Sequence, residues 1–219
     1  MRRNFLPVLG LLSLFVLGSC SAERDPKIAS LKHAIGVADS QLLDAAAQLD
    51  TTNCFPRSLM PKFRAVNAKD WTSGFFPGSL WQCYRFTGDE KLLAEAKKYT
   101  DRLEGIQYYK GTHDLGFMVF CSFGQQMETL HDRHSEEVIV EAAKSLISRC
   151  DPRIGVIRSW DFGEWNYPVI IDNMMNLEML FWASKHTGDP VYRDVAVRHA
   201  DITMKNHYRD DASSYHVVS

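Results

Sequence analysis

The 219-residue sequence lacks several features that would identify other classes of protein. Its longest apolar run, residues 5–17, is shorter than the ~20 residues of a transmembrane helix. No segment shows the sustained alternation of apolar and polar residues that is typical of β-strands. Beyond the first three residues there is no basic run, and the formal net charge is −2, so we expect no nucleic-acid partner.

Cysteine is also sparse, with five residues, and no two of them have the close spacing of metal ligands. We therefore predict no metal and no cofactor. Cys83 and Cys121 fall in apolar helical segments, where a buried free thiol is the expected state. An oxidising compartment would permit disulfides, and the pairing of the cysteines after residue 20 stays open, namely Cys54, Cys83, Cys121 and Cys150.

The first 20 residues differ from the rest of the chain. Arg2 and Arg3 precede the apolar run, which is the pattern of a secretory signal peptide. The run ends in Leu-Gly-Ser-Cys20, which resembles the lipobox of bacterial lipoproteins, where the cysteine becomes the lipidated N-terminus. The alternative is a plain signal peptide with an incidental cysteine. We predict a lipoprotein signal over residues 1–20 and an exported bacterial lipoprotein, periplasmic or outer-membrane-associated, that is anchored to the membrane through Cys20.

The remaining residues, 21–219, alternate between two kinds of helical segment. After a leading helix, apolar helices are each followed by an amphipathic one. A helix that is apolar all round is buried, whereas one with a single apolar stripe lies on the outside, so we expect an inner and an outer layer. The predicted helices are the leading 27–49, the apolar 76–86, 115–130 and 169–185, and the amphipathic 90–104, 136–149 and 190–207.

This alternation is an internal repeat. Thr-Gly-Asp at 87–89 recurs at 187–189, where glycine can end one helix and aspartate can cap the next. Each unit of roughly 50 residues is a helical hairpin, and six such hairpins, over roughly 300 residues, close into a ring. The predicted fold class is all-α, an (α/α)6 toroid of helical hairpins. Because the chain holds three hairpins and stops in an apolar segment, we expect residues 21–219 to be an incomplete domain, about the N-terminal half.

Unusual residues recur in the loops that enter the inner helices. Inner helices of a toroid run parallel, so these loops meet at one mouth. We expect Pro168 to begin the helix that carries Asp172 in its first turn. We expect Ser135 to cap the amphipathic helix 136–149. An aspartate near a helix N-terminus can merely complement the helix dipole, but recurrence at one structural phase favours a functional site. The candidates are Trp71, His113, Asp114, Trp160, Asp172 and His216.

Four segments resemble the unsaturated glucuronyl hydrolases, glycoside hydrolase family 88, and they occur in the family's order. The resemblance covers about residues 30–219. It implies an (α/α)6 barrel and a hydrolase that removes the unsaturated uronic acid from the non-reducing end of lyase-generated oligosaccharides of the glycosaminoglycan type. The matching segments are WTSGFFPG at 71–78, HDLGF at 113–117, IDNMMN at 171–176 and SSYH at 213–216.

By the same resemblance, Asp172 is the general acid/base and Asp114 its essential partner. Trp71, Trp160 and His216 are implied to contact the substrate, and His113 lies beside Asp114. The family's route is hydration of the C4=C5 enol ether. A second carboxylate favours the protonated form of such an acid by like-charge repulsion, and one acid can then give a proton and take one back from water.

Two other functions stay open. An unsaturated rhamnogalacturonyl hydrolase, which acts on pectin fragments, would share the fold and the aspartate pair. A non-catalytic glycan-binding lipoprotein would keep the aromatic residues at the mouth, but binding alone does not require two neighbouring acids. The sequence favours the hydrolase of glycosaminoglycan-type fragments.

Overall fold

The computed structural model describes residues 26–59 and 62–219, so the predicted signal segment and Cys20 lie outside the described residues. The chain divides into a unit of residues 1–38 and a unit of residues 39–219, and the second unit holds all the candidate site residues. Helix α1 (Pro26–Gln48) runs from the first unit into the second. In the part of the chain that the structure describes, no helix is long and apolar enough to cross a membrane.

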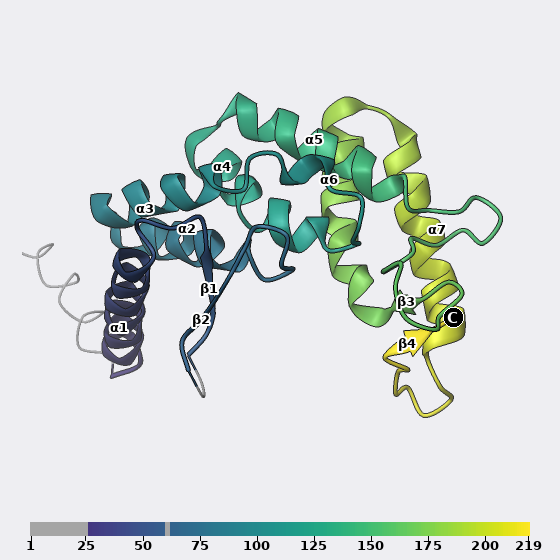
Figure 1. Ribbon diagram of the computed structural model, residues 1–219, viewed down its shortest axis with the longest axis horizontal. Coiled ribbons are helices and arrows are strands. Elements are labelled where there is room, and N and C mark those ends of the chain that lie inside the picture. The colour runs from purple at the N-terminus through teal and green to yellow at the C-terminus, as the bar shows by residue number, and fades with distance from the viewer. Residues whose placement is uncertain (1–25, 60–61) are drawn as a thin grey trace, which may run out of the picture. The chain divides into compact units, whose positions relative to one another are not determined.

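Three helical hairpins follow one another along residues 39–219 (Figure 1), and the predicted all-α fold class is confirmed. Neighbouring hairpins pack through α2 on α4 and through α5 on α6 and α7. The hairpins are α2 (Phe75–Thr87) with α3 (Glu90–Asp101), α4 (Phe123–Leu130) with α5 (Arg133–Ile147), and α6 (Leu177–Thr187) with α7 (Pro190–His207).

The first and third hairpins turn in the way that their sequence repeat predicts. Gly88 and Gly188 are left-handed, with φ of 70° and 77°, a conformation that glycine adopts without strain. Asp89 and Asp189 then accept a hydrogen bond from the backbone N–H two residues further on. The repeated tripeptide therefore ends one helix and begins the next at both places.

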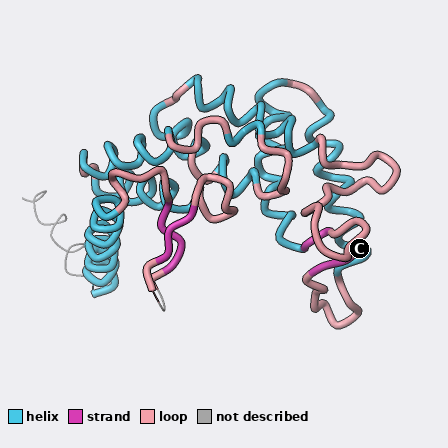
Figure 2. The backbone as a smooth tube through the Cα atoms, viewed as in Figure 1, coloured by secondary structure: helices cyan, strands magenta, loops and turns pink. Residues whose placement is uncertain are grey.

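Two short antiparallel strand pairs, which the sequence did not predict, accompany the helices (Figure 2). Strands β1 (Phe55–Ser58) and β2 (Arg64–Val66) lie in the predicted loop before the first hairpin. Strands β3 (Val169–Ile170) and β4 (Val217–Val218) join the entry to α6 with the segment after α7.

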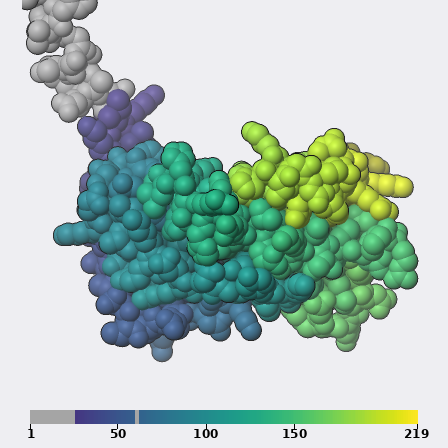
Figure 3. All heavy atoms as spheres, turned by 90° about the horizontal axis from the view of Figure 1, so that it is seen from above, coloured from purple at the N-terminus to yellow at the C-terminus, as the bar shows by residue number. Residues whose placement is uncertain are grey.

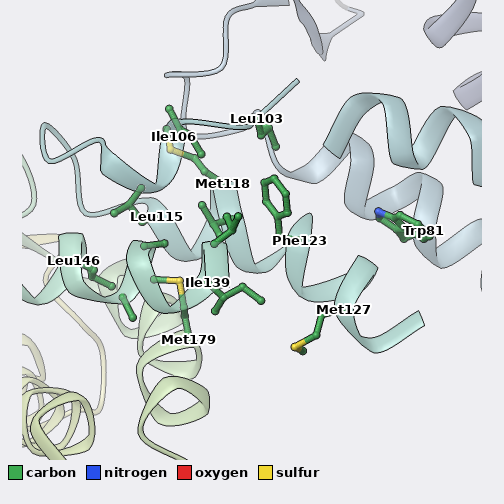
Figure 4. Packing of buried hydrophobic residues seen from close by; sticks show 14 of the residues in the cluster. Trp81, Leu103, Ile106, Leu115, Met118, Phe123, Met127, Ile139, Leu146 and Met179 are labelled. Carbon is green, nitrogen blue, oxygen red and sulfur yellow. The ribbon is translucent and has the colours of Figure 1, made fainter. Parts of the chain in front are cut away.

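The core of this unit is formed by side chains from all three hairpins (Figure 4). Trp81, Phe123, Ile139 and Leu180 are essentially inaccessible to solvent. The indole N–H of Trp81 donates to the hydroxyl of Thr100 across the first hairpin at 2.9 Å, so its one polar atom is satisfied in the core. This packing supplies the rigid frame on which the loops are held.

The prediction of a continuous helix over 115–130 was wrong. A π-helical turn, η3 (Gly116–Phe120), comes first, and α4 begins only at Phe123. In η3 the N–H of Cys121 donates to the carbonyl of Gly116, five residues back. The N–H of Phe117, which lies in the first turn and has no intrahelical acceptor, donates to the side-chain oxygen of Asn176.

The prediction that Pro168 begins a helix over 169–185 was also wrong. Val169 and Ile170 pair with β4, and the N–H of Ile171 donates to the carbonyl of His216 at 2.9 Å. Because these contacts hold the backbone extended, the chain coils only from Ile171. It forms the 3₁₀ turns η4 (Ile171–Asn176) before α6 starts at Leu177.

The predicted N-cap of the second amphipathic helix was misplaced by three residues. Asp132, not Ser135, caps α5, and its carboxylate accepts from both the backbone N–H and the hydroxyl of Ser135. An ionised side chain at this position also complements the helix dipole. The helix therefore begins at Arg133, and Ser135 lies within its first turn.

Candidate active site

His113 stands at the centre of the candidate site and is only 4% exposed. Its Nδ1 lies 3.0 Å from the carbonyl oxygen of Ser159, and its backbone N–H donates to the same oxygen at 3.2 Å. On the opposite side of the ring, Nε2 lies 3.2 Å from Oδ1 of Asp114 and 3.2 Å from Oδ1 of Asp172. The structure thus brings the two predicted catalytic acids onto one imidazole nitrogen.

These contacts determine how protons are arranged around His113. A carbonyl oxygen only accepts, so Nδ1 must carry a hydrogen. A hydrogen bond at Nε2 then needs a further proton, either on the ring, giving an imidazolium, or on one of the two carboxyl groups. A proton can therefore pass between His113 and either acid, an arrangement that is compatible with acid/base chemistry.

The surroundings favour retention of that proton. Burial by itself lowers the pKa of His113, but the hydrogen bond with Asp172 and the negative charge of Asp114 outweigh it, so the pKa is raised. Burial raises the pKa of Asp114, and this effect exceeds the opposing influence of His113 and of the Thr112 hydroxyl, which donates to Asp114 at 2.5 Å. The buried part of the site holds protons at a higher pH than exposed groups of the same kind.

Asp70 is a third acid near the site that the sequence did not reveal. Its carboxylate accepts from the backbone N–H and hydroxyl of Thr72, at 3.0 and 2.6 Å, and from Nε of Arg57 at 3.3 Å. Although burial acts in the opposite direction, these bonds lower the pKa of Asp70. Asp70 is thus a fixed negative charge that further raises the pKa of Asp114.

Two buried asparagines of η4 attach the segment that carries Asp172 to its neighbours. Asn176 accepts from the N–H of Phe117 at 3.2 Å, and Asn173 donates to the carbonyl of Ile157 at 3.1 Å. Gly116 is required at this junction, because a Cβ there would lie 2.5 Å from Oδ1 and 2.8 Å from Cα of Asn176. Asp114 and Asp172 are therefore carried by two turns in direct contact.

Trp71 lies in an aromatic cluster next to this junction and keeps 43% of its surface exposed. Its ring makes edge-to-face contacts with Phe75 and Phe117, with centroids 5.9 and 6.1 Å apart. Phe117 follows Asp114 by three residues, so Trp71 packs against the segment that begins at that acid. The guanidinium of Arg57 lies over the indole ring, 5.7 Å from its centroid.

Trp160 and His216 are linked to the acids through backbone neighbours. Trp160 directly follows Ser159, the residue that orients His113, and its ring stacks on Phe162 with centroids 5.7 Å apart. The carbonyl of His216 accepts from the N–H of Ile171, next to Asp172, and the His216 side chain is exposed. All six predicted site residues therefore belong to connected segments of residues 39–219.

The same nitrogen and carboxyl oxygens lie within 4.8 Å of one another and form a donor set that could hold a metal ion. Imidazole and carboxylate are common ligands of divalent transition metals. The prediction that the protein uses no metal is untested by this geometry and stays a prediction.

Comparison with known proteins identifies relatives for most of the chain, although no family model matches it. Over 173 residues, 76% of the chain, it is 47% identical to an unsaturated glucuronyl hydrolase of Formosa agariphila and covers 43% of that protein. Over 162 residues, 71% of the chain, it is 35% identical to an unsaturated chondroitin disaccharide hydrolase of Streptococcus pyogenes serotype M1 and covers 40% of it. The crystal structure of an unsaturated glucuronyl hydrolase specific for heparin matches with a TM-score of 0.77 and 45% identity, over 84% of this chain and 51% of that one.

The helical hairpins match part of the α/α toroid of a class of glycoside hydrolases. More narrowly, the chain belongs to the unsaturated glucuronyl hydrolase family, as its motifs predicted. It spans less than half the length of the curated relatives described above.

Proposed function

We propose that the protein removes the unsaturated uronic acid from the non-reducing end of lyase-generated oligosaccharides by hydrating its C4=C5 enol ether. The observation that carries this proposal is the placement of Asp114 and Asp172, each 3.2 Å from Nε2 of His113. The names of the relatives support the reaction class. The roles of the individual residues are part of the proposal.

The difference in exposure between the two acids supports the roles proposed for them. The Asp172 side chain is 40% exposed, whereas that of Asp114 is 16% exposed. Asp172 is thus the acid that a substrate can reach, and it serves as general acid and then general base. Asp114 and His113, which lie behind it, set the local charge and the position of the proton.

The reaction then proceeds by proton transfers at one carboxyl group. Asp172 gives its proton to C4, which leaves an oxocarbenium ion at C5. Water attacks C5 and returns a proton to Asp172, so the acid is regenerated and a hemiketal forms. The C5–O5 bond then breaks to give a ketone at C5 and a hemiacetal at C1, and collapse of the hemiacetal releases the neighbouring sugar.

The proposed substrates are glycosaminoglycan-type fragments. Two of the relatives are named for chondroitin disaccharides and for heparin, respectively, and these names favour such fragments over the pectin fragments of the rhamnogalacturonyl alternative. Parallel turnover of unsaturated disaccharides from chondroitin, heparin and rhamnogalacturonan will decide between them. Faster turnover of the rhamnogalacturonan disaccharide would establish the alternative.

The chemistry is tested by running the reaction of the protein in heavy water. If C4 is protonated from solvent, every product molecule carries deuterium at C4, and the ultraviolet absorbance of the double bond is lost. Cleavage at the glycosidic bond alone would leave C4 unlabelled and would refute the proposal. Tight binding of the disaccharide without turnover would favour the glycan-binding alternative.

We also propose that the protein is exported and lipidated at Cys20, on the basis of the lipobox-like Leu-Gly-Ser-Cys sequence after the apolar run. Metabolic labelling with a radioactive fatty acid in a bacterial host should label the wild type but not Cys20→Ser. Equal labelling of both proteins would exclude this anchor. The anchor and the catalytic proposal are independent of each other.

A further inference from the structure

One face of α7 is buried yet polar, which is unusual for a helix packed into a domain. His199 and His207 are 0% and 2% exposed, and Thr203 between them is 1% exposed. Their spacing of four residues places all three on one side of the helix. A buried imidazole is costly unless its nitrogens find partners. Each ring has one nitrogen bonded to the segment that carries the site, whereas Nε2 of His199 and Nδ1 of His207 have no hydrogen-bond partner among the described residues.

His199 binds the backbone at one end of this segment. The N–H of Ile157 donates to Nδ1 of His199 at 3.0 Å, so Nδ1 is the unprotonated nitrogen. Burial lowers the pKa of His199 to about 4, and the ring therefore stays neutral and keeps Nδ1 as an acceptor near neutral pH. The carbonyl of Ile157 meanwhile accepts from Asn173, so both polar backbone groups of this residue are held.

His207 binds the backbone at the other end. Its Nε2 lies 2.9 Å from the carbonyl oxygen of Val169, which can only accept, so Nε2 donates. The backbone carbonyl of His207 accepts from the N–H of Tyr215 at 2.7 Å. One residue thus holds β3 through its side chain and the segment leading into β4 through its main chain.

The two histidines therefore form hydrogen bonds with the backbone at both ends of the loop 157–169. In the views of Figures 1 and 3, α7 and this part of the chain lie together at one end of the unit of residues 39–219. Within the loop, the N–H of Ser159 donates to the carbonyl of Pro168 at 2.8 Å, and the N–H of Ile170 donates to the Ser159 hydroxyl at 2.9 Å. The loop is closed on itself and held at each end by α7.

The loop ends lie very close to the catalytic groups in sequence. Ser159, whose carbonyl fixes the ring of His113, is two residues after Ile157, and Asp172 is three residues after Val169. We propose that His199 and His207 are positioning residues that set the Ser159 carbonyl and the Asp172 carboxylate at the correct places relative to His113. Their effect on turnover rests on the proposed function, whereas their hydrogen bonds to the backbone of Ile157 and Val169 do not.

Replacement of each histidine by asparagine and, separately, by glutamine tests this proposal. The amide oxygen of asparagine can take the place of Nδ1, and the amide nitrogen of glutamine can take the place of Nε2. We expect His199→Asn and His207→Gln to keep most of the wild-type kcat. His199→Gln and His207→Asn should lose up to about 10²-fold in kcat, the scale of a ~1 Å misplacement of catalytic groups. The matched control is Thr203→Val on the same buried face, which should keep the wild-type kcat.

Hydrogen exchange gives a readout that does not depend on activity. The amide of Ile157 should be protected in the wild type and in His199→Asn, and it should exchange at least about tenfold faster in His199→Gln. If the wild type turns over no unsaturated uronide, the proposed function fails while this measurement still tests the hydrogen bond between His199 and Ile157. An unprotected Ile157 amide in the wild type would overturn the inference. Equal kcat in the asparagine and glutamine variants at both positions would overturn it as well.

Discussion

Nδ1 of His113 lies 3.0 Å from the carbonyl oxygen of Ser159, a residue 46 positions further along the chain. This contact fixes the ring's tautomer and aims Nε2 at the two carboxyl groups. The backbone carbonyl of Ser159 thereby determines which nitrogen of His113 faces the two acids.

Asp172→Asn should abolish most activity while binding persists. Asparagine keeps the shape of the side chain but has no proton to transfer to C4 and cannot take one from water. Because one group serves both steps, we expect a loss greater than the ~10²–10⁴-fold that is typical for a single general acid or base. Steady-state rates and calorimetric binding of an unsaturated disaccharide measure the two effects. Near-normal turnover by Asp172→Asn would show that Asp172 is not the general acid/base.

Asp114→Asn should reduce activity severely but make the fold slightly more stable at neutral pH. Since the pKa of buried Asp114 is raised, its ionised form costs stability as the pH rises through that pKa. Asparagine can still accept from the Thr112 hydroxyl and can donate to Nε2 of a neutral His113. We expect a higher Tm than that of the wild type, and calorimetry at pH 7 measures it. A clear fall in Tm would show that the carboxylate stabilises the fold.

The stability of the fold should depend on pH through His199. Its pKa is lowered from 6.5 to about 4, so the unfolded chain binds a proton that the folded protein excludes. This stabilisation is fully present above pH 6.5 and is lost as the pH falls toward 4. It amounts to about 3 kcal/mol. Urea unfolding at pH 7.5 and 4.5 should show a larger loss for the wild type than for His199→Asn, which does not titrate. Equal losses in the two proteins would contradict the assignment.

Gly116→Ala should separate the two turns that carry the acids. The added methyl would lie 2.8 Å from Cα of Asn176, a backbone atom that cannot rotate away. We expect a loss of about 1–3 kcal/mol in stability, as in overpacked cores, together with impaired turnover. Gly36→Ala in α1 is the control, because an added Cβ there would meet no atom within 4 Å apart from its chain neighbours and the adjoining backbone of its own helix. This control should be neutral or should stabilise by about 0.5–1 kcal/mol.

The sequence by itself determined the fold class and predicted the candidate site residues. Helical periodicity, the repeated Thr-Gly-Asp turns and the capping role of Asp89 act within one or two turns of the chain, and such local rules can be followed along a sequence. The prediction that His113, Asp114 and Asp172 meet came from repetition, because equivalent loops of stacked hairpins fall on one side. Asn173 and Asn176, spaced three apart in an apolar segment, were a visible signal that sequence reasoning did not use.

Tertiary structure alone decided how the site is held. The 3₁₀ start of the Asp172 segment follows from pairing of β3 with β4, whose register joins Val169 to Val218. The hydrogen bond between His199 and Ile157 joins residues 42 positions apart, and that between His207 and Val169 joins residues 38 positions apart. Buried backbone groups must find partners wherever packing brings them. Contacts between distant residues are set by how hairpins stack, and no local pattern encodes which carbonyl a buried histidine will meet.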